Sequence, residues 1–77
     1  MTLNSKNIVG KNLIRYRKEA KLSQCQLAVN VGTGQKTISK IENGNHNFSI
    51  DTLEKLCNGL GIPVYKIFIP DEEMKIK

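Results

Sequence analysis

The chain has 77 residues and carries 12 Lys or Arg against seven Asp or Glu, a formal net charge of +5. A chain of this length forms one small domain that buries about 60% of its unfolded surface, which leaves little room for a deep catalytic pocket. No stretch approaches the roughly 18 apolar residues of a membrane span, and the N-terminus has no apolar run typical of a signal peptide. We therefore expect a cytoplasmic protein with no membrane partner.

The basic charge is concentrated in the first two thirds of the chain. Residues 1–50 contain eight basic and two acidic side chains, whereas residues 51–77 contain four basic and five acidic ones. This asymmetry favours a surface that faces a polyanion. Ordinary solvated surface charge is the alternative interpretation.

Cysteine and histidine do not occur at the spacing of a metal site. The chain has Cys25, Cys57 and His46, and in a cytoplasmic protein both thiols are expected to be free. We interpret Cys57 as a core residue, Cys25 as a residue on the outer side of its helix, and His46 as a surface histidine. Neither a metal nor another cofactor is expected.

Apolar residues recur at helical spacing from residue 8 onward, which predicts an all-α domain. The first helix covers about residues 8–20, and one of its faces is apolar. That face consists of Val9, Leu13, Tyr16 and Ala20. Lys21 stands where a glycine often ends a helix, so we predict a left-handed backbone there at a cost of roughly 1 kcal/mol.

Two short helices follow, with a glycine between them. Ser23 is suited to cap the second helix, whose apolar face is Leu27, Ala28 and Val31, and Gly32 is suited to end it in a left-handed conformation. The third helix covers residues 35–43 and buries Ile38 and Ile41. This spacing is that of a helix-turn-helix, in which the outer side of the third helix is free to enter a DNA major groove.

Two further helices complete a compact five-helix domain. Ser49 caps a helix over residues 50–60, which Gly61 ends. The apolar face of this helix consists of Leu53, Leu56, Cys57 and Leu60. Pro63 fits the first turn of a fifth helix over residues 63–68, although helix and strand patterns compete over residues 62–69. We divide the chain into a flexible N-terminal segment (1–7), a helix-turn-helix domain (8–69) and a polar C-terminal tail (70–77).

A series of short motifs lies between residues 8 and 68. The motifs are LSQ at 22–24, LA at 27–28, GT at 32–33, TISKIENG at 37–44, SIDTL at 49–53 and LGI at 60–62. In this order and spacing they resemble the Cro/C1-type, or Xre-like, helix-turn-helix family, which includes lambdoid phage repressors and restriction-modification controller proteins. The resemblance implies a lambda-repressor-like fold. It also implies a sequence-specific transcriptional regulator, in the first place a repressor, which binds an inverted-repeat operator in double-stranded DNA as a homodimer.

The resemblance also implies which residues contact DNA. Base contacts are expected from the exposed side of the third helix, where glutamine suits adenine and lysine suits guanine. These residues are Gln35, Lys36, Ser39 and Lys40. Phosphate contacts are expected from Gln24, Thr37, Asn43, Asn45 and Asn47. The alternatives are that Lys36 and Lys40 contact only phosphates and that Gln24 is an ordinary exposed glutamine.

The chain departs from the family in the loop after the third helix. Asn45, His46 and Asn47 stand where relatives often place lysine or arginine, and Phe48 stands where proline is common. These differences remove formal charge from a segment that runs along the DNA backbone in the family.

Two structural roles are also implied by the resemblance. Arg17 and Glu42 match an ion pair that joins the first helix to the third, with two unrelated surface charges as the alternative. Val64, Phe68 and Ile69 are expected at a dimer interface, although some of them can instead close the core of the monomer.

Two other classes of function compete with a DNA-binding regulator. A protein-interaction module would agree with the low charge of residues 45–47, but Gln35, Lys36 and Lys40 offer no apolar anchors for a protein partner. An enzyme is disfavoured because no nucleophile–base pair, carboxylate dyad or phosphate-binding loop is recognisable. The sequence therefore predicts a non-enzymatic DNA-binding regulator, with no indication of a small-molecule effector.

Overall fold

The computed structural model describes residues 5–45 and 48–70. Its elements are four α-helices and one 3-10 helix: α1 (Ser5–Glu19), α2 (Gln24–Val31), α3 (Gln35–Glu42), α4 (Ile50–Leu60) and η1 (Val64–Phe68). The all-α prediction is confirmed over these residues. The predictions for His46, for Asn47 and for most of the segments 1–7 and 70–77 fall outside the described residues.

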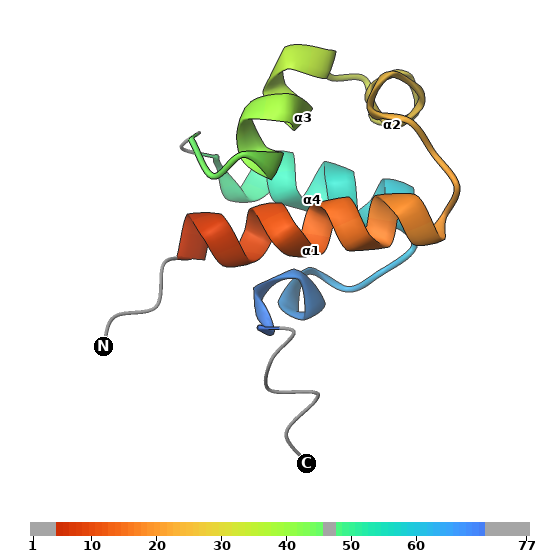
Figure 1. Ribbon diagram of the computed structural model, residues 1–77. Coiled ribbons are helices and arrows are strands. Elements are labelled where there is room, and N and C mark those ends of the chain that lie inside the picture. The colour runs from red at the N-terminus through yellow and green to blue at the C-terminus, as the bar shows by residue number, and fades with distance from the viewer. Residues whose placement is uncertain (1–4, 46–47, 71–77) are drawn as a thin grey trace.

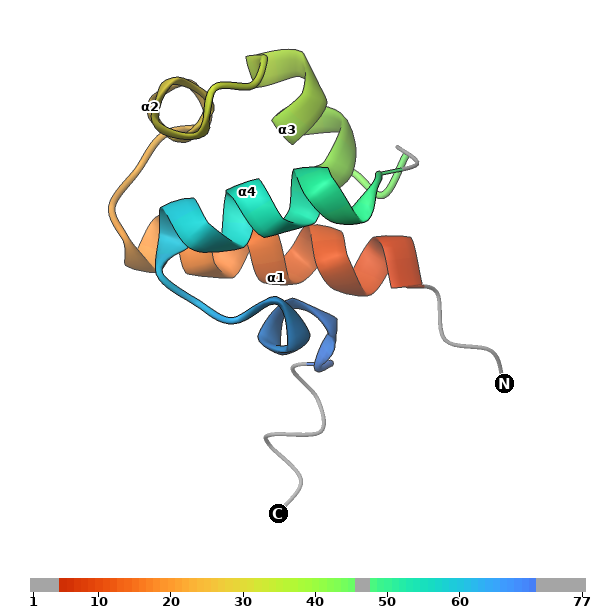
Figure 2. The ribbon, with the colours of Figure 1, turned by 180° about the vertical axis from the view of Figure 1, so that it is seen from behind.

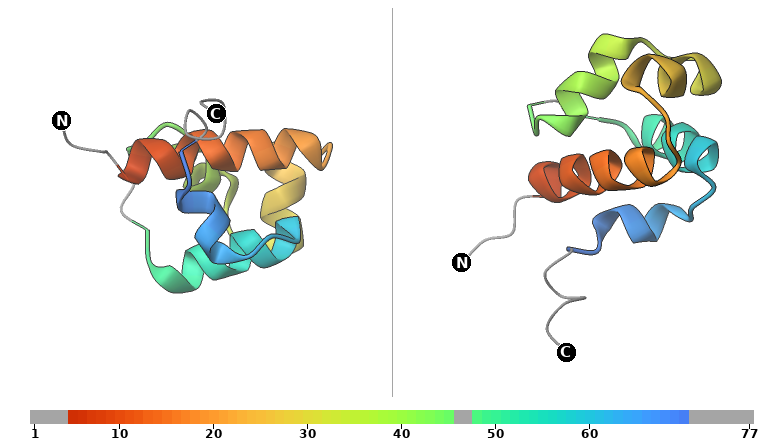
Figure 3. Two further views of the ribbon diagram at one scale, coloured as in Figure 1. Left: turned by 90° about the horizontal axis from the view of Figure 1, so that it is seen from below. Right: turned by 45° about the vertical axis from the view of Figure 1, so that its right-hand side comes forward.

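The helices are arranged in three levels. The pair α2 and α3 lies on one side of α1 and α4, and η1 lies on the other side (Figure 1). The view from behind shows α4 in front of α1, with the same order of levels (Figure 2). Seen from below, η1 crosses the space between α1 and α4, and it contacts both helices (Figure 3). The predicted recognition helix α3 and η1 are therefore on opposite sides of the molecule.

All five helices contribute to one apolar core. The fully or almost fully buried apolar side chains are Val9, Leu13, Leu27, Ala28, Ile38, Ile41, Leu53, Leu56, Cys57 and Ile67. This set includes the predicted core residues of α3 and most of those of α4, whereas Ala20 is exposed and Tyr16 is only half-buried. Ile67, which was not singled out from the sequence, supplies the buried anchor of η1.

The ends of α1 differ from the prediction. The helix begins at Ser5, three residues before the predicted start, and the Asn7 side chain lies against Gly44, in the space that a Cβ at Gly44 would occupy. At the other end α1 stops at Glu19, because Lys21 takes the predicted left-handed conformation (φ 62°). The amides of Lys21 and Leu22 then donate to the carbonyls of Lys18 and Arg17, which is the Schellman arrangement with lysine at the usual glycine position.

The fifth helix is a 3-10 helix rather than the α-helix expected from Pro63. Pro63 is extended (φ −71°, ψ 151°) and precedes the helix, and Ile69 is extended before Pro70. A residue that precedes proline is excluded from the α-helical region by steric clash with the proline ring. Only five residues remain between these two boundaries, a length at which the tighter 3-10 helix is common.

Candidate nucleic-acid interface

The helix-turn-helix is set by the caps on either side of its turn. Ser23 accepts from the amide of Gln26, and the Gln26 side chain accepts in return from the amide of Ser23, which forms a capping box at the start of α2. Gly32 ends α2 at φ 74°, a left-handed conformation that glycine adopts without strain. Gly34 precedes α3 and has no side chain to cap it. The turn therefore needs only three residues between the two helices.

One side of α3 is fixed to the rest of the domain. Ile38 and Ile41 are fully buried, and Glu42 is only 9% exposed. Gly10 of α1 lies directly beneath the end of α3, where an added Cβ would come within 2.5 Å of the Ile41 carbonyl oxygen and 2.8 Å of that of Glu42. Glycine is therefore required at position 10 for α1 and α3 to approach this closely. This contact was not predicted from the sequence.

The opposite side of α3 is polar and free of acidic residues. Gln35, Lys36 and Lys40 are exposed, whereas Ser39 and Thr37 are half-buried. Gln35 and Ser39 are four residues apart, as are Lys36 and Lys40, which places them on one side of the helix. The structure thus brings the four predicted base-contacting residues together on a single surface.

Most of the residues predicted to contact phosphates lie before or after α3 in the sequence. Asn43 and Asn45 are exposed beyond the end of α3, and Gln24 is half-buried at the first position of α2. Asn47 lies outside the described residues. Gln24, Asn43 and Asn45, the described amide residues of this set, carry no formal charge.

Arg17 and Glu42 form a two-point ion pair between α1 and α3. Arg17 Nε donates to Glu42 Oε2 at 2.6 Å and Arg17 Nη2 donates to Glu42 Oε1 at 3.2 Å. Arg17 Nη1 also donates to the carbonyl oxygen of Leu22 at 2.9 Å, in the loop between α1 and α2. One guanidinium thus joins the end of α3 to the start of the helix-turn-helix.

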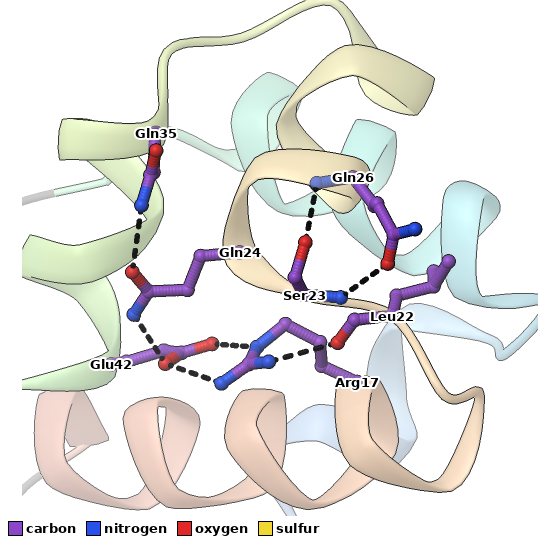
Figure 4. A network of polar contacts seen from close by, with 7 residues as sticks. All are labelled: Arg17, Leu22, Ser23, Gln24, Gln26, Gln35 and Glu42. Carbon is purple, nitrogen blue, oxygen red and sulfur yellow. Dashed lines mark hydrogen bonds and ion pairs between the residues drawn. The ribbon is translucent and has the colours of Figure 1, made fainter.

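The ion pair is extended by two glutamines to the start of α3 (Figure 4). Gln24 Nε2 donates to Glu42 Oε1 at 2.9 Å, and Gln35 Nε2 donates to Gln24 Oε1 at 3.4 Å. We call Arg17, Glu42, Gln24 and Gln35 the polar chain. The family resemblance predicted Arg17 and Glu42 as a pair, but Gln24 and Gln35 were assigned separate roles, and the links between Glu42 and Gln24 and between Gln24 and Gln35 were missed. The only available signal was that both glutamines occupy the first position of a helix.

The helix-turn-helix family model (HTH_3) matches residues 13–67. The chain belongs to the HTH_3, or Cro/C1-type, helix-turn-helix family. It is 30% identical to the HTH-type transcriptional regulator y4dJ of Sinorhizobium fredii over 71 residues, which are 92% of each chain. It is 39% identical to the immunity repressor protein of Bacillus phage phi105 over 69 residues, which are 90% of this chain but 46% of the repressor. The HTH_3 chain therefore spans about half the length of that repressor.

A solved structure of an HTH_3 relative has the same fold. The restriction-modification controller protein C.AhdI of Aeromonas hydrophila superimposes with a TM-score of 0.79 at 28% identity, covering 82% of this chain and 96% of the controller. The HTH_3 family is one of transcriptional regulators, and these relatives are described as a regulator, a repressor and a controller rather than as enzymes.

On the far side of the HTH_3 domain, η1 presents aromatic residues. Tyr65 is 64% exposed and Phe68 is 38% exposed, whereas Val64 and Ile69 are half-buried and Val64 packs against the core. Residues three apart lie above one another on a 3-10 helix, so Tyr65 and Phe68 share one face, here called the η1 face. Tyr65 was not singled out from the sequence, and Val64 lies partly in the core of the monomer.

A buried asparagine holds η1 against α1. Asn12 is 2% exposed, and its Nδ2 donates to the carbonyl oxygens of Ile67 at 2.7 Å and of Ile69 at 2.9 Å. Its Oδ1 accepts from Arg15 at 3.4 Å. Asn12 is on the same helical face as Val9 and Leu13, so a polar residue within an apolar face was the signal that could have identified it.

The remaining chemistry-bearing residues do not form a site within the described parts of the chain. Cys25 is exposed and Cys57 is buried, as predicted, and burial raises the pKa of the Cys57 thiol. Among residues 5–45 and 48–70, no three His, Cys, Asp or Glu side chains are grouped to hold a metal ion. None of the described helices is both long and apolar enough to cross a membrane.

Proposed function

We propose that this HTH_3 protein is a sequence-specific repressor that binds double-stranded DNA as a homodimer on an inverted-repeat operator. The observation that carries the proposal is the outer side of α3, where Gln35, Lys36 and Lys40 are exposed together while Ile38 and Ile41 hold the helix to the core. A helix anchored on one side and polar on the other is able to enter a major groove.

Base reading is assigned to Gln35, Lys36, Ser39 and Lys40. A glutamine amide matches the donor–acceptor pattern of adenine N6 and N7, and a lysine ammonium matches the two acceptors of guanine, O6 and N7. Gln35 is at the first position of α3 and Lys40 is more than one turn further along. The two residues are therefore suited to read different base pairs of one half-site.

Phosphate contacts are assigned to Gln24, Thr37, Asn43, Asn45 and Asn47. Gln24 and Thr37 are in the first turns of α2 and α3, where the positive end of the helix dipole attracts an anion. Four of these five residues carry neutral amides, so we expect a modest dependence of affinity on salt, dominated by the lysines.

A homodimer is supported by the η1 face. Tyr65 and Phe68 are exposed aromatic side chains on one side of a short helix, and aromatic residues are enriched at the buried centres of protein interfaces. Ile69 adjoins this face, and Val64 supports it from the core. A two-fold dimer presents two recognition helices to half-sites about one helical turn apart.

Repression is supported by the functions of two relatives. The matched phage protein is an immunity repressor and the matched solved structure is a restriction-modification controller. Occupation of an operator by the bound dimer is the mode of action proposed for this chain.

The experiment that tests the function is selection of bound duplexes from a random DNA library at near-physiological salt. Enrichment of an inverted repeat with half-site centres about 10 base pairs apart is the expected result. Gln35→Ala should then weaken the free energy of operator binding by about 1–3 kcal/mol and relax specificity at one base pair of each half-site. Sequence-blind recovery would reject the operator model and redirect the search to a protein partner.

A further inference from the structure

The polar chain ends on Gln35, one of the residues proposed to read bases. A glutamine amide has nearly the same shape in both orientations, but it presents a donor at one end and an acceptor at the other. Its neighbours therefore decide which base it recognises. We propose that Glu42, which is buried and outside the base-reading surface, sets the amide orientation of Gln35 through Gln24 and so acts as a specificity-positioning residue. This inference rests on the proposed base contact of Gln35.

The first step is the fixed polarity of Glu42. An ionised carboxylate accepts hydrogen bonds and donates none. Arg17 holds both of its oxygens, at 2.6 Å and 3.2 Å, and the Glu42 side chain is almost completely enclosed. Glu42 is therefore a rigid acceptor whose orientation does not depend on DNA.

The second step is the orientation of Gln24. Because Glu42 Oε1 only accepts, the group of Gln24 that faces it at 2.9 Å must be the Nε2 amide. The Gln24 carbonyl oxygen is then directed toward the start of α3 (Figure 4). The opposite orientation would bring two acceptors together in a half-buried position, which is unfavourable.

The third step carries the orientation to the recognition helix. Gln24 Oε1 is an acceptor, so Gln35 presents Nε2 to it, at 3.4 Å. Gln35 keeps its carbonyl oxygen and one N–H for another partner. That pair is the donor–acceptor pattern that matches adenine, and the reversed amide would interchange the two groups. The final bond is long and exposed, so we expect the effect of one weak hydrogen bond, about a three- to tenfold change in base preference.

Two variants test the relay at different points. Glu42→Gln replaces the obligate acceptor with an amide that can face Gln24 by either end. Gln24→Met removes the middle link and leaves the Arg17–Glu42 pair intact. Glu54→Gln, on the exposed side of α4, is the control for loss of one negative charge. Binding of each variant is measured on the selected operator and on duplexes substituted at one base pair at a time.

Both test variants are expected to lower the preference for adenine at the base pair that is sensitive to Gln35→Ala, by about three- to tenfold, with the other preferences unchanged. Glu54→Gln should leave all preferences unchanged. Should Glu42→Gln not fold, as judged by circular dichroism, Gln24→Met decides alone. Unchanged base preferences in the folded variants would overturn the inference, including the case in which Gln24→Met lowers the affinity for all sequences alike, because loss of the proposed phosphate contact of Gln24 would do that alone. If no base pair responds to Gln35→Ala, the proposed base contact itself has failed, which is a different pattern of results.

Discussion

The helix α1 is attached to α3 on one side and to η1 on the other, and the two attachments differ in kind. Toward α3, Gly10 allows close contact of the backbones and Arg17 pairs with the buried carboxylate of Glu42. Toward η1, the neutral amide of Asn12 donates to two backbone carbonyls. A charged pair thus holds the proposed recognition helix, whereas a neutral side chain holds the helix that presents the η1 face.

The common feature of the two sides is an acceptor that aligns an amide. The Glu42 carboxylate orients Gln24, and the carbonyls of Ile67 and Ile69 orient Asn12. The two sides differ in where the aligned amide leads, because Asn12 is buried, whereas Gln24 bonds onward to an exposed residue of α3. Variants on the α3 side should therefore alter DNA recognition, and variants on the η1 side should alter self-association.

The largest effect is expected from Glu42→Ala, which leaves the half-buried Arg17 guanidinium without its carboxylate. Removal of one partner of a buried ion pair costs about 3–5 kcal/mol. Thermal unfolding followed by circular dichroism should show a much lower midpoint than for Glu54→Ala, in which an exposed carboxylate of α4 is removed. Equal shifts for the two variants would contradict a stabilising role of the pair.

Asn12→Ala is expected to lower the free energy of unfolding by about 1–3 kcal/mol, because the carbonyls of Ile67 and Ile69 in and after η1 lose their donor. Sedimentation equilibrium should also show weaker association of the proposed dimer, since η1 is less well held. Lys11→Ala, at an exposed neighbouring position of α1, is the matched control. An unchanged unfolding midpoint for Asn12→Ala would mean that water replaces the amide without loss.

Gly10→Ala is expected to lower the free energy of unfolding by about 1–3 kcal/mol, because the new methyl group meets the backbone oxygens of Ile41 and Glu42, which cannot rotate away. Gly59→Ala in α4 is the informative comparison: its methyl group would meet Cγ1 of Val31, which is a side-chain atom, and alanine is the better helix former. Urea unfolding should rank Gly10→Ala as the less stable variant. The reverse order would show that α3 can move away from α1 at little cost.

The smallest effect is expected from Lys21→Gly at the end of α1. The left-handed conformation of Lys21 is strained for a side chain with a Cβ, and glycine relieves that strain. Because glycine also loses more entropy on folding, the net gain should not exceed about 1 kcal/mol, or a few degrees in the unfolding midpoint. Lys21→Gln, which removes the charge and keeps the strain, should show no such gain.

Most of the local structure could be predicted from the sequence. The caps at Ser23 and Ser49, the left-handed ends at Lys21, Gly32 and Gly61, the buried face of α3 and most of the buried face of α4 were predicted and are confirmed. The base- and phosphate-contact assignments stay predictions until a DNA complex is measured. The predicted start of α1 and the predicted type of the fifth helix were wrong, because helix ends and very short helices depend on contacts with residues far away in the sequence.

By itself, the sequence determined where α2, α3 and α4 lie, how their ends are formed and which of their faces is apolar, because these properties depend on residues within one or two turns of each other. Only the tertiary structure decided that Asn12 meets carbonyls 55 and 57 residues away, that Gly10 lies beneath the end of α3, and that Gln24 joins Glu42 to Gln35. Such contacts depend on how helices are placed relative to one another. Periodicity gives the direction in which a side chain points, but not the polar group that it meets.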